Sequence, residues 1–371
     1  MQTGKSRESL LRKPAVQTLF ASLLCVVLGL LVGYIALIII NPKGATNAIV
    51  DVLKNFLTYS KVDKQLKHFG STLITTAPLL MCALSVLFAY KVGLFNIGAA
   101  GQYVAGAGAC LYCALALHLP WFVCLLAAVI AGAILGAISG FLKAYRNVNE
   151  VISCIMLNWI SLYLVNTLLS GVKNPTGKDT YTLASQNTGA ILPALGLNDL
   201  LNNKNVTIAI PLSILVCVFI WVLLTKTRLG YELRATGLNK NAAKYCGMRD
   251  RYNIILTMAI AGGLAGFGAA MLYLSDFEQW AVTQASVPAM GFNGIAAAFL
   301  GGLNPIGAIF SSYFIQHITR GGAALTSTGV YSSQTSDLIT SVIIYMCSFV
   351  LFMKQAMNRW LDNREQKGGK G

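Results

Sequence analysis

Residues 16–40 read VQTLFASLLCVVLGLLVGYIALIII and contain no charged side chain. A helix needs about 20 mainly apolar residues to cross the hydrocarbon core of a bilayer, so this stretch alone predicts a transmembrane helix. It is longer than the apolar core of a secretory signal peptide, which has roughly 7–15 residues, and no small-x-small cleavage site follows it. We therefore expect a retained membrane anchor.

Similar apolar runs recur along the chain. Hydrophobic residues make up 56% and charged residues 11% of the sequence, and the mean hydropathy is +0.64. This composition is too apolar for a soluble domain, and continuous runs exclude a β-barrel. We expect an all-α polytopic membrane protein, one permease domain over residues 1–371, with about ten transmembrane helices. The predicted spans are 16–40, 71–90, 95–117, 120–142, 151–170, 206–225, 252–274, 287–302, 305–320 and 336–353.

The distribution of positive charge predicts the orientation. With the N-terminus inside, ten spans leave 19 of the 28 Lys and Arg residues in the cytoplasm, as the positive-inside rule requires. Both tails, 1–15 and 354–371, and the connection 226–251 are then cytoplasmic, whereas the long loops 41–69 and 171–205 are extracellular. We expect a multi-pass protein of the bacterial cytoplasmic membrane.

The net charge of +15 follows this topology. It favours anionic inner-leaflet lipid as a partner and does not indicate nucleic acid. The motif Cys110-x-x-Cys113 has no second pair and no nearby histidine, and the three histidines lie in different segments. Neither a zinc site nor a hydrolytic centre is predicted, so we expect a protein that is not an enzyme.

The sequence carries no visible source of energy. The predicted spans are nearly free of the ionisable residues that ion-driven carriers keep in the membrane. The nearest approach to a P-loop, residues 171–179, has five residues between its glycines and Asp179 where Ser or Thr belongs. Energy must come from another chain, or the protein is a passive channel.

The connection 226–251 is the candidate contact for such a chain. Asn239 suits a helix N-cap and Gly247 suits the position after a helix, which predicts a short helix from Lys240 to Cys246. So short a helix needs a surface to pack on, and small residues suit insertion into a groove of a partner. The alternative is a solvated basic loop that only sets topology. The residues assigned to coupling are Gly237, Asn239, Lys240, Ala242, Ala243 and Gly247.

Four strings together resemble a known family. Residues 230–248, GYELRATGLNKNAAKYCGM, are similar to the coupling segment of ABC transporter permeases of the ribose and branched-chain amino acid group. Residues 92–102, 149–159 and 291–307 agree with this resemblance. The combination is most similar to nucleoside uptake permeases that work with a basic-membrane-protein type lipoprotein receptor.

The resemblance implies an importer with two permease subunits, the second a paralogue or another copy of this chain. Two cytoplasmic ATPases would bind ATP and Mg²⁺, an extracellular lipoprotein would deliver the substrate, and this chain would hold no cofactor. A sugar or branched-chain amino acid is the alternative substrate. An autonomous channel or secondary carrier is the alternative of another class.

A polar, uncharged substrate would suit amide side chains, which both donate and accept hydrogen bonds. Trp159 could stack on a nucleobase. The alternative for each of these residues is a structural role, since buried amides also join or cap helices. Asn149 and Glu150 are interpreted as a helix cap and a helix-start acid. The candidates for the substrate path are Asn96, Gln102, Asn158, Trp159, Asn166 and Asn293.

Small residues indicate close helix packing. Gly132, Gly136 and Gly140 share one helix face, as do Gly262 and Gly266. A short echo between FNIGAAG at 95–101 and FNGIAAA at 292–298 suggests an inverted internal repeat, with chance similarity as the alternative. Whether 287–320 forms two helices or one re-entrant unit is open.

The two outer loops differ in pattern. Apolar residues between Ile49 and Leu57 recur at helical spacing, which predicts an amphipathic helix on the outer surface. The loop 171–205 is too long for a simple connection. Contact with the receptor or the second permease is expected for one or both loops, and disorder is the alternative.

Overall fold

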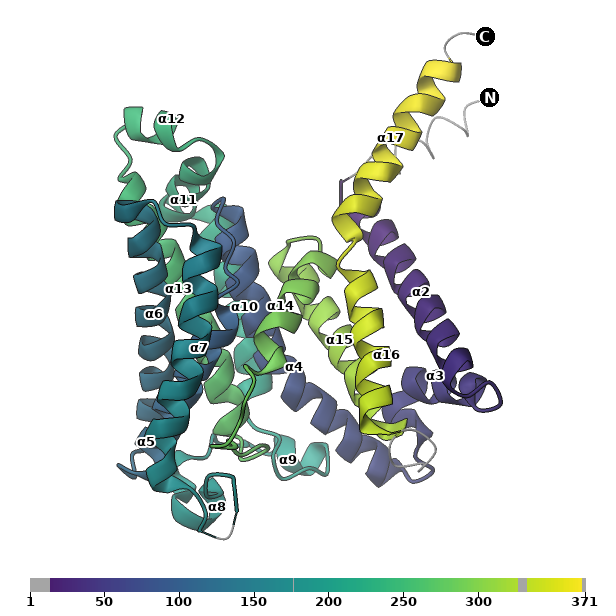
Figure 1. Cartoon of the computed structure of the whole chain (residues 1–371), viewed down its shortest axis with the longest axis vertical. Helices are drawn as coiled ribbons and strands as arrows, with labels where there is room; N and C mark the ends of the chain where they lie inside the picture. Colours follow the sequence, from purple (N-terminus) through teal and green to yellow (C-terminus); the bar gives the residue numbers. More distant parts are fainter. Residues whose placement is uncertain (1–13, 176, 326–331, 369–371) are drawn as a thin grey trace. The chain divides into compact units, whose positions relative to one another are not determined.

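The computed structural model describes residues 14–175, 177–325 and 332–368, and every regular element within them is a helix (Figure 1). Seven helical segments within them are long and apolar enough to cross a membrane, the last being Gln334–Trp360, which includes a short break. This confirms the prediction of an all-α polytopic membrane protein. The number of ten spans and the cytoplasmic termini stay predictions. The chain packs as two compact units, Tyr59–Ile295 and Met1–Thr58 with Ala296–Gly371, and the single permease domain also stays a prediction.

One helix forms the centre of the larger unit. In the most apolar 18-residue stretch of each helix, 94% of the residues of α4 and 72% of those of α13 are buried. The corresponding share for α6, α7 and α10 is 28–33%. The outer faces of these last three helices are therefore the ones suited to contact lipid. The long helices of this unit are α4 (Val62–Lys91), α5 (Ala99–Leu115), α6 (Trp121–Arg146), α7 (Glu150–Leu169), α10 (Ala209–Lys226) and α13 (Asp250–Tyr273).

Helices α6 and α13 pack backbone to backbone. A Cβ atom added at Gly262 would meet the backbone of Gly132, and one added at Gly266 would meet the backbone of Ala128. A Cβ at Gly136 would likewise meet the carbonyl group of Met258. Only small residues permit so close an approach, which confirms the prediction that these glycines serve packing.

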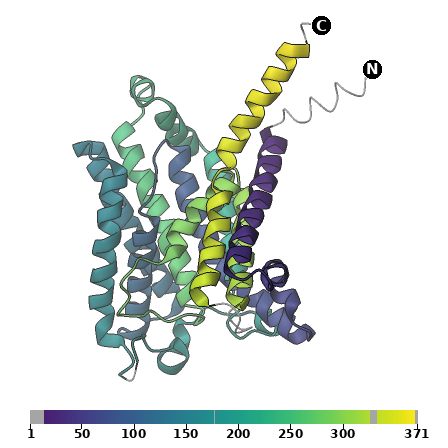
Figure 2. The ribbon, with the colours of Figure 1, turned by 45° about the vertical axis from the view of Figure 1, so that its right-hand side comes forward.

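The smaller unit is built around the pairing of α2 (Pro14–Ile40) with α16 (Ser333–Cys347), which Figure 2 shows side by side. Gly29 and Gly33 of α2 lie against Ile343 of α16. The last helix, α17 (Val350–Gly368), also contacts α2, and the Lys354 Nζ atom donates to Thr18 Oγ1 at 3.0 Å.

A short helix within residues 41–69, the first loop that is predicted to be extracellular, belongs to the same unit. Helix α3 (Ala45–Lys54) buries Ala45, Ala48 and Val52 and continues into the 3₁₀ turn η1 (Asn55–Thr58). Val52 lies against Gly321 of α15, and His317 of α15 contacts the Leu53 carbonyl oxygen at 2.8 Å. The predicted amphipathic helix is therefore confirmed, and its position on the outer surface stays a prediction.

Residues 287–320 form two helices, α14 (Ala289–Leu300) and α15 (Pro305–Leu325). The turn between them places Gly302 at φ +66° and Leu303 at φ +55°. Beyond the turn, Ser311 Oγ donates to the Ala297 carbonyl oxygen at 2.6 Å, so α15 folds back onto α14. The N-terminal part of α14 packs on the larger unit, where Gly291 touches Ala100 and Gly294 touches Cys82.

The loop 171–205, which is predicted to be extracellular, is joined to the helices of the larger unit by side-chain hydrogen bonds. Asn187 donates to the carbonyl oxygens of Ala114 and Leu119 at 2.9 and 3.0 Å. Asp276 accepts from the Leu183 amide at 2.8 Å, and Asn205 donates to the carbonyl oxygen of Asp276 at 2.8 Å. Over residues 177–205 the structure therefore favours an ordered segment over disorder. Its short helices are α8 (Leu183–Gln186), η3 (Thr188–Ala190) and α9 (Leu197–Leu200), after η2 (Ser170–Val172).

Candidate coupling site and intramembrane polar residues

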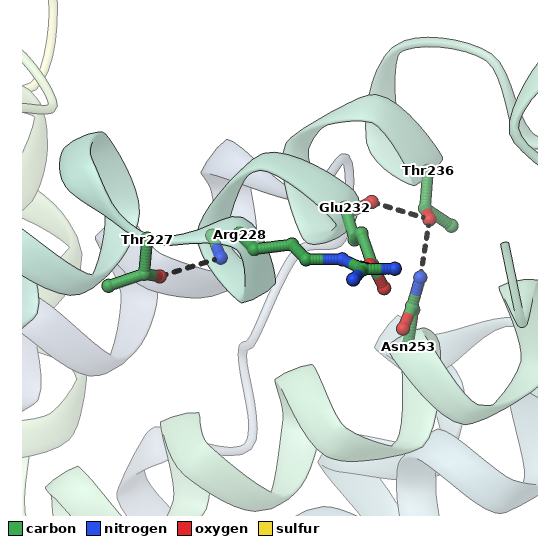
Figure 3. Close-up of polar contacts among 6 residues, drawn as sticks. Thr227, Arg228, Glu232, Thr236 and Asn253 are labelled. Carbon is green, nitrogen blue, oxygen red and sulfur yellow. Dashed lines mark hydrogen bonds and ion pairs between the residues drawn. The ribbon is translucent and has the colours of Figure 1, made fainter.

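The connection between α10 and α13 contains two helices, of which α11 (Arg228–Leu238) is the first. It begins at Thr227, whose Oγ1 accepts from the Gly230 amide at 3.0 Å (Figure 3). The same hydroxyl donates to the Leu223 carbonyl oxygen of α10 at 2.6 Å. A hydroxyl at the N-cap satisfies an amide that the helix leaves without a partner, and here it also joins the two helices.

Two contacts fix the C-terminal half of α11. Thr236 Oγ1 accepts from Asn253 Nδ2 of α13 at 2.8 Å and donates to the Glu232 carbonyl oxygen at 2.8 Å (Figure 3). Both Thr236 and Asn253 are buried. On another side, the backbone of Gly237 lies against Val92, in the turn that follows α4. Helix α11 is therefore attached to both α13 and the end of α4.

The second helix, α12 (Lys240–Tyr245), begins at the predicted residue and ends one residue before the predicted Cys246, which is its C-cap. Asn239 Oδ1 accepts from the Ala242 amide at 3.0 Å, which confirms the N-cap. Gly247 has φ +80°, and its amide donates to the Lys244 carbonyl oxygen at 3.0 Å. The Met248 amide donates to the Ala243 carbonyl oxygen at 3.0 Å. Together these two bonds make a Schellman motif, which confirms the prediction that Gly247 is the residue that follows the helix end.

The residues assigned to coupling do not share one surface. Asn239, Lys240, Ala242 and Gly247 are exposed, whereas Ala243 is only 3% exposed and packs within the chain. Gly237 is half-buried against Val92. The sequence argument missed two large apolar side chains that are almost fully exposed, Leu238 at 89% and Tyr245 at 93%. Binding of an ATPase here stays a prediction.

Three of the intramembrane candidates lie together in the larger unit. Asn96 Nδ2 donates to Gln102 Oε1 at 2.8 Å and to Ser85 Oγ at 2.9 Å, and Gln102 Nε2 donates back to Asn96 Oδ1 at 3.1 Å. Asn158 Oδ1 accepts from the Gly101 amide at 2.8 Å. All three amides are at most 3% exposed. Their polar groups fix the irregular segment before α5 to α4 and α7.

The other three candidates lie elsewhere. Asn166 accepts from Trp280 Nε1 at 2.9 Å, and it donates to the Gln284 carbonyl oxygen at 2.9 Å. Trp280 is fully buried and was missed because it lies outside the predicted spans. Trp159 is 43% exposed and stacks on Tyr163, with ring centroids 6.1 Å apart. Asn293 is half-buried on α14.

The start of α7 has the predicted cap. Asn149 Oδ1 accepts from the Val151 amide at 2.9 Å, and the Glu150 carboxylate pairs with Lys143 Nζ at 2.8 Å. Glu150 thus joins the first turn of α7 to the last turns of α6. A structural role for both residues is confirmed.

The comparison with known protein families now identifies the chain. Residues 69–348 match the family described as "Branched-chain amino acid transport system / permease component". The chain belongs to this permease family. The permease is therefore an integral protein of the cytoplasmic membrane and a transport subunit of an ABC transporter, which works with other ABC transporter subunits.

The permease is similar to three curated proteins over most of its length. It is 32% identical to the guanosine ABC transporter permease protein NupP of Bacillus subtilis (strain 168), over 85% of this chain and 92% of the relative. It is 34% identical to the nucleoside ABC transporter permease protein NupB of Lactococcus lactis subsp. cremoris (strain MG1363), over 78% and 81%. It is 28% identical to the glucose ABC transporter permease protein TsgB13 of Haloferax volcanii, over 92% and 90%.

Two neighbouring residues of α7 test the structural role of the buried amides. Asn158→Leu would leave the Gly101 amide and the Ile97 carbonyl oxygen, now bonded at 2.8 and 3.2 Å, without their partner. We expect a loss of stability of about 1–3 kcal/mol, since interhelical hydrogen bonds in membranes are each worth roughly 0.6–1.7 kcal/mol. Equilibrium unfolding of the permease in detergent measures it. The exposed neighbour provides the control, and Trp159→Leu should leave stability unchanged.

Proposed function

We propose that the permease is the membrane subunit of an ATP-driven nucleoside importer. The observation that carries the proposal is its similarity to the guanosine and nucleoside permeases, at 32% and 34% identity over most of both chains. In this proposal an extracellular lipoprotein receptor delivers the nucleoside, and a second related permease completes the pathway. ATP and Mg²⁺ bind to separate ATPase subunits, so this chain has no catalytic centre of its own.

A sugar permease is the second candidate, because a relative named for glucose transport matches 92% of the chain. Nucleosides and sugars both present hydroxyl groups, so amide and hydroxyl side chains would suit either substrate. The nucleoside is favoured because the two nucleoside relatives are more similar in sequence than the glucose relative.

The ATPase is proposed to bind at α12 and the adjoining exposed residues. Three features support this site. The helix is capped at both ends, exposed apolar residues lie at its C-terminal end (Tyr245) and just before it at the end of α11 (Leu238), and α11 connects it to α13 and α4. Exposed aromatic and aliphatic side chains are frequent anchors of protein interfaces. Lys240 and Ala242 lie on the exposed part of α12 and are retained as contact residues.

For the substrate path, Asn293 is the candidate that we would test first. Its side chain is partly exposed on α14, whereas Asn96, Gln102 and Asn158 already bond to protein groups. Rearrangement of those bonds during transport would be needed to offer the same amides to a substrate. Trp159 is proposed to contact lipid, since its ring is exposed on α7.

An uptake assay tests the proposed function. The permease, its ATPases, its second permease and its receptor are produced in cells that lack nucleoside uptake, and entry of radiolabelled guanosine is measured. We expect uptake that requires this chain and that excess unlabelled nucleosides reduce at least tenfold. Competition by glucose or ribose, and not by nucleosides, would favour the sugar candidate. Transport by the purified chain alone, in liposomes without ATP, would contradict both the nucleoside importer and the sugar importer. It would establish an autonomous carrier or channel.

A further inference from the structure

A groove lies between α11 and the turn that joins α12 to α13. Its volume is about 470 Å³, within the range of roughly 300–1,000 Å³ typical of pockets that bind compact ligands. It is therefore large enough for a few side chains of a partner segment. Its lining residues come from three elements: Arg228, Leu229, Tyr231 and Glu232 from α11, Cys246, Gly247, Met248 and Arg249 from the turn, and Tyr252 and Asn253 from α13.

Hydrogen bonds stabilise the elements on two sides of this groove. Asn253, a lining residue, donates to Thr236, and Arg228 Nε donates to Glu232 Oε1 at 2.9 Å across one turn of α11 (Figure 3). The turn on the opposite side is held by the Schellman motif at Gly247. The groove is therefore lined by a hydrogen-bonded turn on one side and by two helices joined to each other on the other.

The charges around the groove favour an acidic occupant. Between residues 226 and 253 the chain has seven Lys and Arg residues and only two acids. Both acids are paired, Glu232 with Arg228 at 2.9 Å and Asp250 with Lys240 at 3.5 Å. Arg249 lines the groove and is exposed, and no ion pair links it to an acid within the described parts of the chain. A guanidinium in this position suits a carboxylate, which it can bind with two hydrogen bonds.

The rest of the lining favours apolar neighbours of that acid. Leu229 and Met248 are half-buried, and Tyr231 and Tyr252 are 61% and 56% exposed. Aromatic residues and Arg are enriched in protein interfaces, where they supply contact area with a polar tip. The occupant that fits these features is a peptide segment with an Asp or Glu beside an apolar residue.

We propose that this groove receives an acidic segment of the ATPase subunit. The inference rests on the proposed function, and it adds a second contact to the exposed residues of α12. The groove adjoins α12 because Cys246 and Gly247 belong to its lining. A protein that binds α12 therefore covers the groove at the same time. The interface is then mutual, since each subunit inserts a segment into the other.

A native cysteine gives direct access to the groove. Cys246 lines it and is exposed, whereas the other eight cysteines are buried or partly buried. A maleimide-linked benzophenone attached to Cys246 is irradiated in the transporter complex, purified through a tag on the ATPase. We expect a crosslink to the ATPase, and mass spectrometry should find an Asp or Glu within the crosslinked peptide. In a separate measurement, ATPase that is bound before labelling should slow the reaction of Cys246 with maleimide at least tenfold.

Two charge reversals complete the test. Arg249→Glu should reduce the crosslink at least tenfold, since it places two carboxylates face to face. Lys226→Glu makes the same change in charge at the exposed end of α10, outside both α12 and the groove lining, and should reduce the crosslink less than threefold. Equal effects of the two variants, or a photoproduct with phospholipid in place of the ATPase, would overturn the proposal. If the ATPase co-purifies with the permease but no crosslink forms, the proposed occupancy of the groove is refuted and the proposed function is not. If no ATPase co-purifies with the permease, the proposed function is refuted as well.

Discussion

Gly262→Ala is expected to destabilise the permease by about 2 kcal/mol, because overpacking a close interface typically costs roughly 1–3 kcal/mol. The added methyl group would lie 2.9 Å from the Gly132 carbonyl carbon and 3.1 Å from the Gly136 Cα atom. Those are backbone atoms, which cannot rotate away as a side chain can. Relief therefore requires α6 and α13 to move apart along the length of their contact.

The adjacent glycine is a matched control. At Gly263 the nearest atom to an added Cβ is Val129 Cγ1 at 3.4 Å, an ordinary van der Waals separation. Alanine forms helix better than glycine by roughly 1 kcal/mol, so Gly263→Ala should leave stability unchanged or raise it slightly. Equilibrium unfolding of both variants in detergent measures the difference. Equal stabilities would contradict the backbone contact between α6 and α13.

Gly237→Ala is expected to abolish at least nine-tenths of ATP-driven uptake while the ATPase still binds. A Cβ atom at this position would lie 2.7 Å from the Val92 Cα atom and closer still to its carbonyl group. The end of α11 would be forced away from the turn after α4. The exposed surface of α12 is on other residues and would keep its structure, so binding and transport should separate.

The measurement compares three quantities for each variant: ATPase co-purification, ATP hydrolysis in proteoliposomes and guanosine uptake. For Gly237→Ala we expect normal co-purification with loss of uptake. The next residue, Leu238, is 89% exposed and belongs to the proposed ATPase surface. A substitution there should therefore affect binding of the ATPase before it affects coupling. Leu238→Ala should weaken co-purification first. Normal uptake by Gly237→Ala would refute a coupling role for this contact.

The sequence predicted the local structure of the coupling segment well, because helix ends depend on a few adjacent residues. Asn239 has the cap geometry that its side chain favours, and Gly247 has the positive φ that glycine adopts easily because it lacks a side chain. The burial of Ala243 could not be predicted in the same way. It depends on how α12 folds back on its neighbours, and one methyl group carries little information about that contact.

The intramembrane candidates were harder to predict for a related reason. Helix α7 is apolar on nearly all sides, so its sequence does not indicate which side faces the protein. Trp159 is exposed, whereas Asn158, one residue earlier, is buried. The last predicted span, 336–353, is two helices that meet at Ser348 and Phe349, where apolar composition continues across the break.

The attachment of α11 has a mechanical consequence. At Gly237 and Val92 two backbones touch without a bond, and such a contact resists compression steeply but resists separation only by weak dispersion forces. Thr236 and Asn253 are joined by a hydrogen bond, which resists separation. Through these two contacts helix α11 can push on the end of α4 and can pull on α13, in addition to its direct connection to α10 at Thr227. Inward and outward strokes of the ATPase would thus reach the membrane through different helices.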